Sequence, residues 1–220
     1  MKVYKLTDQN MQTHYGCQWT LGVEKTTDGS GELCSSGWLH AYTDPLLAVL
    51  LNPIHADIDN PRMFIAEASG KSKSDHGLKV GYTSMKLVEE MPVPDVTSER
   101  RVRFAILCAK EVRRNKKWNA WANKWLSGKD RSIESALTTA SAASYADAAA
   151  TYADAAATAS YATASYAAAS YAAASYAAAS AASTTDAAAA AAAASAATTA
   201  SHASYADIDL IALAHKAMEE

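Results

Sequence analysis

The stretch SYATASYAAASYAAASYAAASAASTTDAAAAAAAAS, residues 160–195, decides how the second half of this chain folds. It belongs to an alanine-rich tract that extends from Ala136 to Ala206, and no Gly or Pro occurs after Gly128. Alanine is the strongest helix former because it loses no side-chain entropy in a helix. The tract is therefore predicted to be α-helical.

The repeat length changes within the tract, and this predicts how the helices are contacted. Two YADAAAT heptads, at Tyr145 and Tyr152, keep tyrosine on one face. In the five-residue units from Ser160, each tyrosine is rotated by roughly 140° from the last. Rings on all sides favour a packed bundle or oligomer. The alternatives are a low-complexity helix with partly exposed tyrosines and a five-residue β-solenoid, whose register holds only over Ser160–Ala179.

Polar residues predict where the helices of the tract begin and end. Asp130 is expected to cap a helix that extends to Ser180, and Asp186 and its neighbours offer N-cap oxygens before the alanine run. A further break is expected over Thr198–Ser204. The last segment, from Ile208 to Ala214, has large aliphatic residues and is expected to dock the tract onto another element.

Residues 1–95 have a different composition, because they hold nearly all of the Gly and Pro. Short alternating or apolar runs predict strands there, at 3–6, 18–23, 38–42, 63–68 and 85–89. Thr43 or Asp44 can cap a helix, DPLLAVLL, expected to end before Asn52. Residues 70–77 read as a polar loop. The fold class is thus predicted as α+β, with a small, mostly antiparallel sheet domain followed by an alanine-rich helical bundle.

Between these parts, Pro92 and Pro94 predict a linker, and a helix is expected from Thr97 or Ser98. Asn115 interrupts it, and a tryptophan-bearing helix then ends at Ser127-Gly128. The chain is therefore predicted to divide into three segments. They are an α+β recognition domain (1–95), basic, tryptophan-bearing connecting helices (96–130) and the Ala/Ser/Tyr-rich helical domain (131–220).

The connecting segment mixes basic residues with tryptophans, which is a pattern found in nucleic-acid-binding proteins. However, Trp118, Trp121 and Trp125 fall at helical spacing on one stripe, which is typical of a core face. The formal net charge of the chain is −3. Nucleic acid is therefore a possible partner that is not favoured.

Composition limits the other classes. The 220 residues include only three cysteines, without zinc spacing, which is typical of a reduced, intracellular protein. The first residues, MKVYKLTDQNMQ, lack the apolar run of a signal peptide. No stretch has the roughly 18 strongly apolar residues of a membrane span, so no membrane association is expected.

The N-terminal domain carries titratable residues without a catalytic or metal-binding pattern. Its histidines lack HxH or HExxH spacing, no phosphate-binding glycine motif occurs, and nothing orients Cys34 and His40 as nucleophile and base. No catalytic residue, metal site or cofactor is predicted. The candidate binding residues mix aromatic and titratable groups: Trp38, His40, Tyr42 and His55. Trp38 and Tyr42 also fit core positions of a strand.

Several stretches resemble a family of uncharacterised bacteriophage proteins with alanine-rich helical C-termini. They are GELCSSGWLHAYTDPLLAVLLNPIHADI (31–58), IAEASGKSKSDHGLKVGYTSMKLVEEM (65–91), FAILCAKEV (104–112) and WANKWLSGKDRS (121–132). The chain is also similar to alanine-rich helical proteins described as immunity proteins. The resemblance implies a phage-encoded protein acting in the host cytoplasm.

The N-terminal domain also resembles, in outline, small ADP-ribosyltransferases of the rifampin-modifying type. The resembling features are a DP-initiated helix, a strand ending in Glu67-Ala68-Ser69-Gly70, and a last strand ending in Val88-Glu89-Glu90. The family's early Y-H-G-T motif has no counterpart in residues 3–7, where its histidine is missing. This resemblance implies an NAD-using fold.

The expected function is that of a non-enzymatic phage accessory protein that binds a host component and counters host defence. The expected partner is a host protein, or another copy of the chain bound through the helices of 131–220. Two alternatives are an NAD-using, ADP-ribosyltransferase-like enzyme and a structural, virion-associated assembly protein.

Overall fold

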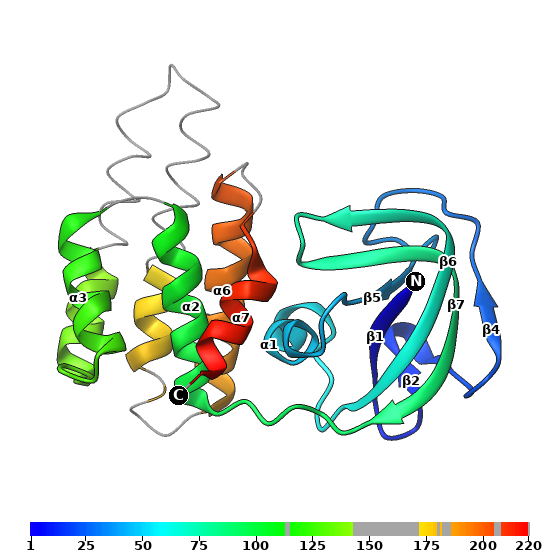
Figure 1. The fold of residues 1–220 in the computed structure, drawn as a ribbon, viewed down its shortest axis with the longest axis horizontal. Coiled ribbons are helices and arrows are strands. Elements are labelled where there is room, and N and C mark those ends of the chain that lie inside the picture. The colour runs from blue at the N-terminus through cyan, green and yellow to red at the C-terminus, as the bar shows by residue number, and fades with distance from the viewer. Residues whose placement is uncertain (113–114, 143–171, 180, 182–185, 205–207, 220) are drawn as a thin grey trace, which may run out of the picture. The chain divides into compact units, whose positions relative to one another are not determined.

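The computed structural model describes residues 1–112, 115–142, 172–179, 181, 186–204 and 208–219. The chain divides into two compact units, Met1–Asp95 and Val96–Glu220. The first contains an antiparallel sheet and the second is helical (Figure 1), so the predicted α+β class is confirmed. The tyrosine repeats, and with them the solenoid alternative and most of the predicted 130–180 helix, lie outside the described residues.

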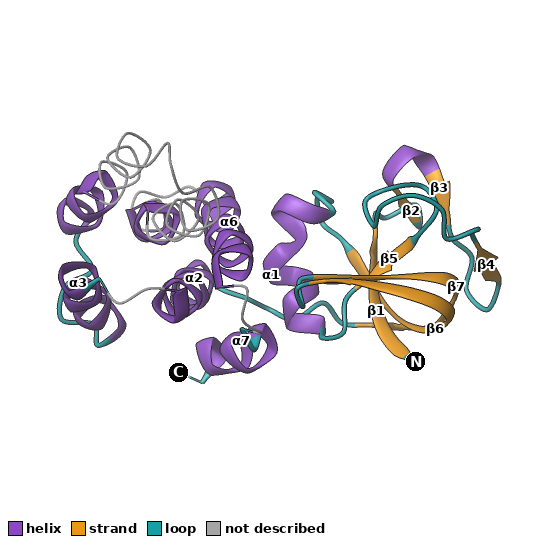
Figure 2. Cartoon of the chain, turned by 90° about the horizontal axis from the view of Figure 1, so that it is seen from above, coloured by secondary structure: helices purple, strands orange, loops and turns teal. Residues whose placement is uncertain are grey.

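The sheet of the first unit follows the order β1 (Lys2–Thr7), β6 (Arg62–Asp75), β7 (Lys79–Met91) and β4 (Glu24–Thr26). A short strand, β5 (Leu39–Ala41), also pairs with β7. A further bridge joins Tyr4 to Tyr42, so the path β1–β6–β7–β5 returns to β1. Figure 2 shows how strongly β6 and β7 curve along this path. The core packed on this sheet includes the buried residues Val3, Phe64 and Met85.

The β6–β7 hairpin bends where its register shifts, between Ser69 and Ser72. Gly70 lies there with a φ of +81°, and a Cβ at this position would stand 2.2 Å from Thr83 Oγ1. The predicted polar loop at 70–77 is wrong, because β6 continues to Asp75 and pairs with β7. Its polar composition reflects exposure of this end of the hairpin.

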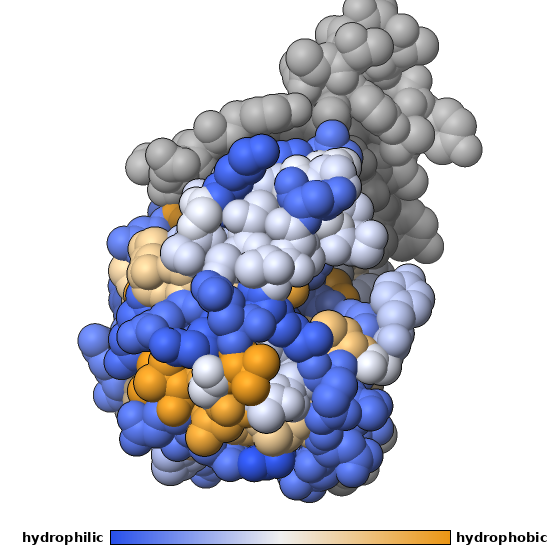
Figure 3. All heavy atoms as spheres, turned by 90° about the vertical axis from the view of Figure 1, so that its right-hand side faces the viewer, coloured by the Kyte–Doolittle hydropathy of each residue, from blue (hydrophilic) through white to orange (hydrophobic). Residues whose placement is uncertain are grey.

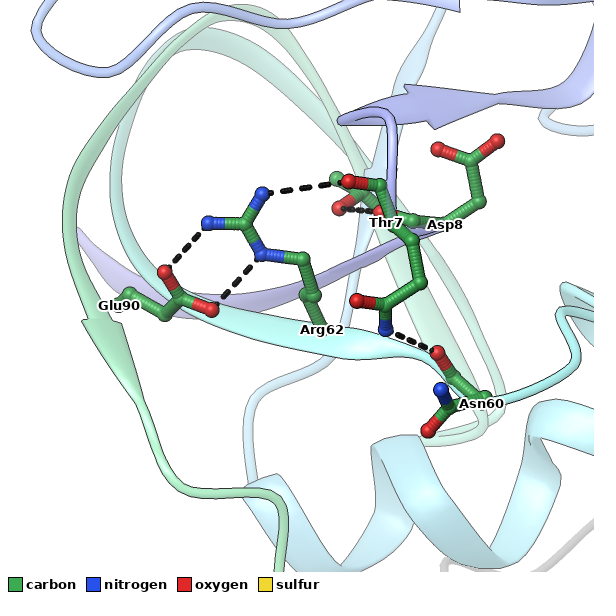
Figure 4. A network of polar contacts seen from close by, with 6 residues as sticks. Thr7, Asp8, Asn60, Arg62 and Glu90 are labelled. Carbon is green, nitrogen blue, oxygen red and sulfur yellow. Dashed lines mark hydrogen bonds and ion pairs between the residues drawn. The ribbon is translucent and has the colours of Figure 1, made fainter.

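A polar network holds the other end of the sheet (Figure 4). Arg62 donates from Nε and Nη2 to the two carboxylate oxygens of Glu90, at 2.8 and 2.5 Å, and so joins β6 to β7. Its Nη1 donates to the carbonyl of Gln9 at 3.5 Å, and the Gln9 amide donates to the carbonyl of Asn60 at 2.6 Å. The loop after β1 is thereby tied to the start of β6.

Helix α1 (Pro45–His55) begins at Asp44, whose carboxylate accepts from the N–H groups of Leu46 and Leu47. The predicted end before Asn52 is wrong, because the helix continues through Pro53. Proline removes one N–H donor, but the last turn is closed by the Ala56 N–H, which donates to the Asn52 carbonyl at 3.1 Å.

A small hairpin precedes α1 in the chain. It consists of β2 (Gln12–Thr13), the 3-10 turn η1 (His14–Gly16) and β3 (Cys17–Gln18). The predicted strand over 18–23 is wrong beyond Gln18. Trp19 turns inward and is 1% exposed, and the chain then turns so that Gly22 donates its N–H to the Leu87 carbonyl.

The helical unit contains α2 (Ser98–Val112), α3 (Lys116–Leu126), α6 (Asp186–Ser204) and α7 (Leu210–Met218). Residues 133–142 and 172–179 are also helical. Helix α2 contacts α3, α6 and α7, so it lies among them. The last helix, α7, therefore docks onto α2, as the large aliphatic residues predict, and its Leu210 is 2% exposed.

Tryptophans fill the space that alanine leaves in this unit. Trp118, Trp121 and Trp125 of α3 are 3–6% exposed and lie in one cluster with alanines from α2, α6 and residues 172–179. The indole N–H of Trp118 donates to Ser175 Oγ at 3.0 Å. That of Trp121 donates to Ser135 Oγ at 3.2 Å. The predicted core stripe is confirmed, and these rings do not present a surface for base stacking.

Two predicted helix boundaries in this unit are displaced. The break predicted near Thr198–Ser204 lies later, because α6 extends to Ser204 and α7 begins at Leu210. Within α6, the hydroxyls of Thr198 and Thr199 donate to the carbonyls of Ala194 and Ser195 one turn earlier, so these polar side chains are accommodated inside the helix. The helix over residues 133–142 is capped by Ser132 and not, as predicted, by Asp130. The Ser132 Oγ accepts a hydrogen bond from the Ser135 N–H.

Within the described residues, no helix combines the length and the apolar character needed to cross a bilayer. Figure 3 shows an apolar patch surrounded by hydrophilic residues on one face of the N-terminal unit. Exposed apolar side chains near the β4–β7 pairing include Leu21, Val23 and Val88.

Candidate functional site

The N-terminal unit contains a cavity of about 530 Å³. Five parts of the chain line it: strand β1, the β2–β3 hairpin, the segment that leads into β5, β5 itself, and the end of α1 with the residues after it. Lys79 at the start of β7 completes the lining. The volume is within the range of roughly 300–1,000 Å³ that small-molecule sites occupy.

All four predicted binding residues line this cavity: Trp38, His40, Tyr42 and His55. Trp38, at 5% exposed, and Tyr42, at 6%, are core residues, so the expected core positions are confirmed, and their role in binding stays a prediction. The closed strand path explains why the four meet. Segment 38–42 pairs with both β7 and β1, and α1 returns His55 to Tyr42.

Aromatic rings form one wall of the cavity. The Tyr42 and His55 rings are stacked, with centroids 6.2 Å apart and planes 12° apart. Burial raises the pKa of the Tyr42 hydroxyl well above its usual value, so this side chain is neutral at pH 7. The Trp38 indole N–H donates to the Gly31 carbonyl at 3.2 Å, which holds the ring in place.

Lys5 is the most unusual residue of the lining, because its side chain is buried. It is 8% exposed, and its Nζ donates to the His40 carbonyl at 2.6 Å. The Trp19 ring lies under the ammonium group, 5.1 Å away at the centroid. Burial lowers the pKa of Lys5 to about 8, and the nearby Cys17 partly opposes this. The amino group is thus mostly charged at pH 7.

His40 lies beside Lys5 but its ring is engaged elsewhere. Its Nε2 contacts the Leu33 carbonyl. Burial lowers the pKa of His40, and the charges of Lys5 and Lys79 add to this effect, against the hydrogen bond to Leu33. His40 is therefore neutral at pH 7, and its Nε2 carries the proton that is donated to Leu33.

Two more polar groups face the same space. Lys79 Nζ lies 3.1 Å from Cys34 Sγ and 4.0 Å from a carboxylate oxygen of Asp75. Thr27 also lines the cavity, and its buried hydroxyl has no hydrogen-bond partner among the residues that the structure describes. A ligand with a hydrogen-bonding group would satisfy this hydroxyl.

Sequence reasoning missed Lys5, Trp19 and Lys79 as site residues. A signal for Lys5 is present in the alternation of residues 3–7, since Val3 and Thr7 face the same side as Lys5 and both are buried. A lysine in such a row is a candidate for a functional position. No comparable signal exists for Trp19 or Lys79, because only the fold brings them to β1 and β5.

The residues considered for catalysis are engaged in other contacts. The Cys34 thiol contacts Lys79, and the His40 ring contacts Leu33, so the imagined nucleophile–base pair is not formed. Glu67 and Glu90, which carry the resemblance to ADP-ribosyltransferases, lie outside the cavity lining and form ion pairs with Lys86 and Arg62. Within the described residues, no group of three or more His, Cys, Asp or Glu side chains is arranged to hold a metal ion.

Residues 1–99 are similar to a domain of unknown function, DUF7666. The match spans the whole N-terminal unit with its cavity and ends at the first residues of α2. Neither the curated proteins nor the solved structures contain a match to the chain.

Proposed function

We propose that this chain is a non-enzymatic binding protein whose N-terminal unit holds a host component in the cavity described above. The observation that carries the proposal is the buried Lys5 ammonium in the lining of an aromatic cavity. Burial of a charged group costs free energy, so its presence in a cavity lining is typical of a binding or catalytic site.

The helical unit would assemble copies of the chain or present them to a host protein through the alanine-rich segment 131–220. Alanine side chains favour this role, because they let helices approach closely while each buries little area. The resemblance of the sequence to bacteriophage proteins supports a phage accessory protein that acts in the host cytoplasm against host defence.

The alternative is an NAD-using enzyme. It is less well supported, because the glutamates that carry the resemblance are paired with Arg62 and Lys86 away from the cavity. A virion-associated assembly protein remains as the third possibility, and it would appear in purified particles at a fixed copy number.

The test is affinity capture from host lysate with three forms of the full chain: the wild type, Lys5→Met and Lys2→Met. Lys2 is on the same strand as Lys5 but is exposed and outside the cavity, so Lys2→Met is the matched control. We expect a component that the wild type and Lys2→Met retain and Lys5→Met loses. Equal capture by all three forms, or release of nicotinamide from NAD by the wild type, contradicts the proposal.

A further inference from the structure

The charges of the cavity lining are of one sign. The ionisable side chains around it include two lysines, Lys5 and Lys79, and three histidines, His14, His40 and His55. No Asp or Glu is among the described residues that line it. A cavity with cationic groups and without carboxylates attracts anions, because low-dielectric walls strengthen the interaction.

Lys5 is the cationic group that is least compensated, because no carboxylate among the described residues forms an ion pair with it and only Cys17 favours its charged form. In the described part of the chain, its nearest partners are the His40 carbonyl, at 2.6 Å, and the Trp19 ring. Neither carries a full negative charge. Lys79, in contrast, has Asp75 within 4.0 Å. An anion that enters the cavity would supply the negative partner that the Lys5 ammonium group lacks among the described residues.

The remaining surface of the cavity suits a flat, apolar group. The Tyr42, His55 and Trp38 rings are part of its lining, and aromatic rings pack edge-to-face or offset against another planar ring. At the rim, the Tyr15 ring is fully exposed, 6.3 Å from the His14 ring. A planar ring would be enclosed by such side chains, and the buried hydroxyl of Thr27 offers it a polar contact.

We propose that the cavity binds a small anion that carries a planar aromatic ring, with the anionic group at Lys5 and the ring along the wall of Trp38, Tyr42 and His55. This inference rests on the proposed function, because it names the class of component that the N-terminal unit holds. A nucleoside phosphate and an aromatic carboxylate share this chemistry.

The test is isothermal titration calorimetry of the full chain with probes that separate charge from ring. Adenosine monophosphate and 1-naphthoate carry both, adenosine and 1-naphthalenemethanol carry only the ring, and inorganic phosphate carries only the charge. We expect at least one of the two charged ring compounds, adenosine monophosphate or 1-naphthoate, to bind about tenfold tighter than its neutral counterpart and than phosphate. Lys5→Met should remove about that factor, and Lys2→Met should not.

Proton uptake gives a second readout that general loss of structure would not imitate. An anion beside Lys5 favours the charged amine, so at pH 8 the wild type should take up a fraction of a proton on binding. Titrations in buffers of different ionisation enthalpy measure this fraction. The other titratable groups around Lys5 are Cys17, His40 and Lys25, which lies over the same Trp19 ring, together with Lys79, His14 and His55 of the cavity lining. Lys5→Met leaves them in place and should abolish the uptake.

The outcomes separate this inference from the proposed function. Equal affinity for charged and neutral rings, or unchanged affinity in Lys5→Met, overturns the inference. Absence of binding for every probe, combined with host-component capture that depends on Lys5, overturns the inference and leaves the proposed function standing. Absence of both binding and capture overturns both.

Discussion

At the scale of single residues, Lys5 links stability to binding. Its pKa is about 8 in the folded chain and 10.5 in the unfolded one. Between these values the unfolded state binds more protons, so the free energy of unfolding rises with pH across this window. Below pH 8 the cost of the buried charge is fully present. The site is thus maintained against a stability cost that a binding function would explain.

The first prediction is that Lys5→Met stabilises the chain at pH 7. Removal of the buried charge gains about 1–3 kcal/mol, after loss of the bond to the His40 carbonyl is deducted. The gain should shrink as pH rises from 8 to 10.5, because the wild type loses its buried charge there. Urea unfolding of both forms at several pH values measures it. A Lys5→Met variant that is less stable than the wild type at pH 7 contradicts this account, and Lys2→Met should match the wild type.

Gly70 is required for two reasons, since its backbone is left-handed and the Thr83 side chain lies close to it. Gly70→Ala is predicted to cost about 2–4 kcal/mol, because the new Cβ meets Thr83 at the bend of β6–β7. Gly22→Ala is the control. Gly22 also has a positive φ, +77°, but open space around it, so only the backbone strain of about 1 kcal/mol remains. Thermal unfolding of the two variants compares them, and equal losses would show that the clash with Thr83 is relieved at no cost.

At the scale of elements, prediction from sequence succeeds where one periodic pattern dominates. The tryptophan stripe of α3 and the capped start of α1 at Asp44 are read from local spacing. It fails where pairing overrides composition. Residues 70–75 are polar and resemble a loop, yet β6 continues through them and residues 72–75 pair with β7. Helix α6 extends past Thr198 to Ser204, and the Thr198 hydroxyl donates to the Ala194 carbonyl inside the helix.

The tryptophan–serine bonds between helices give the next prediction. Trp118→Phe and Ser175→Ala each remove the bond of 3.0 Å between α3 and residues 172–179. Each should cost about 1–2 kcal/mol, and the double variant should cost about 1 kcal/mol less than their sum, because both changes remove one shared interaction. Ser141→Ala, at an exposed helical position, should be nearly neutral. Strictly additive losses in a urea-unfolding cycle would show that the bond contributes nothing.

At the scale of the whole molecule, the change of composition near residue 95 predicts two kinds of structure, and the chain does divide there into two units. The cavity, in contrast, is not predictable from composition. Its lining combines positions 5 to 79, and contacts such as Lys79 with Cys34 depend on how non-periodic loops are placed by the closed strand path. Local sequence patterns carry no information on such contacts, so Trp38, His40, Tyr42 and His55 are predictable as chemical types but their shared cavity is not.

The two-unit organisation predicts that residues 1–99 fold without the helices. The core around Val3, Phe64 and Met85 and the cavity itself lie entirely within the first 95 residues. The fragment should show cooperative unfolding and bind the charged ring probes within about threefold of the full chain. Circular dichroism and calorimetry check both. A fragment that is folded but does not bind would mean that the helical unit contributes to the site.

The central claim is that the Lys5 cavity binds a host component without turning it over, and native mass spectrometry of untagged full chain from a bacterial host background tests it most directly. The account predicts an added small mass on the wild type and on Lys2→Met that is absent from Lys5→Met, with all three forms folded. An added mass of equal occupancy on Lys5→Met, or a bare wild-type chain, would contradict it.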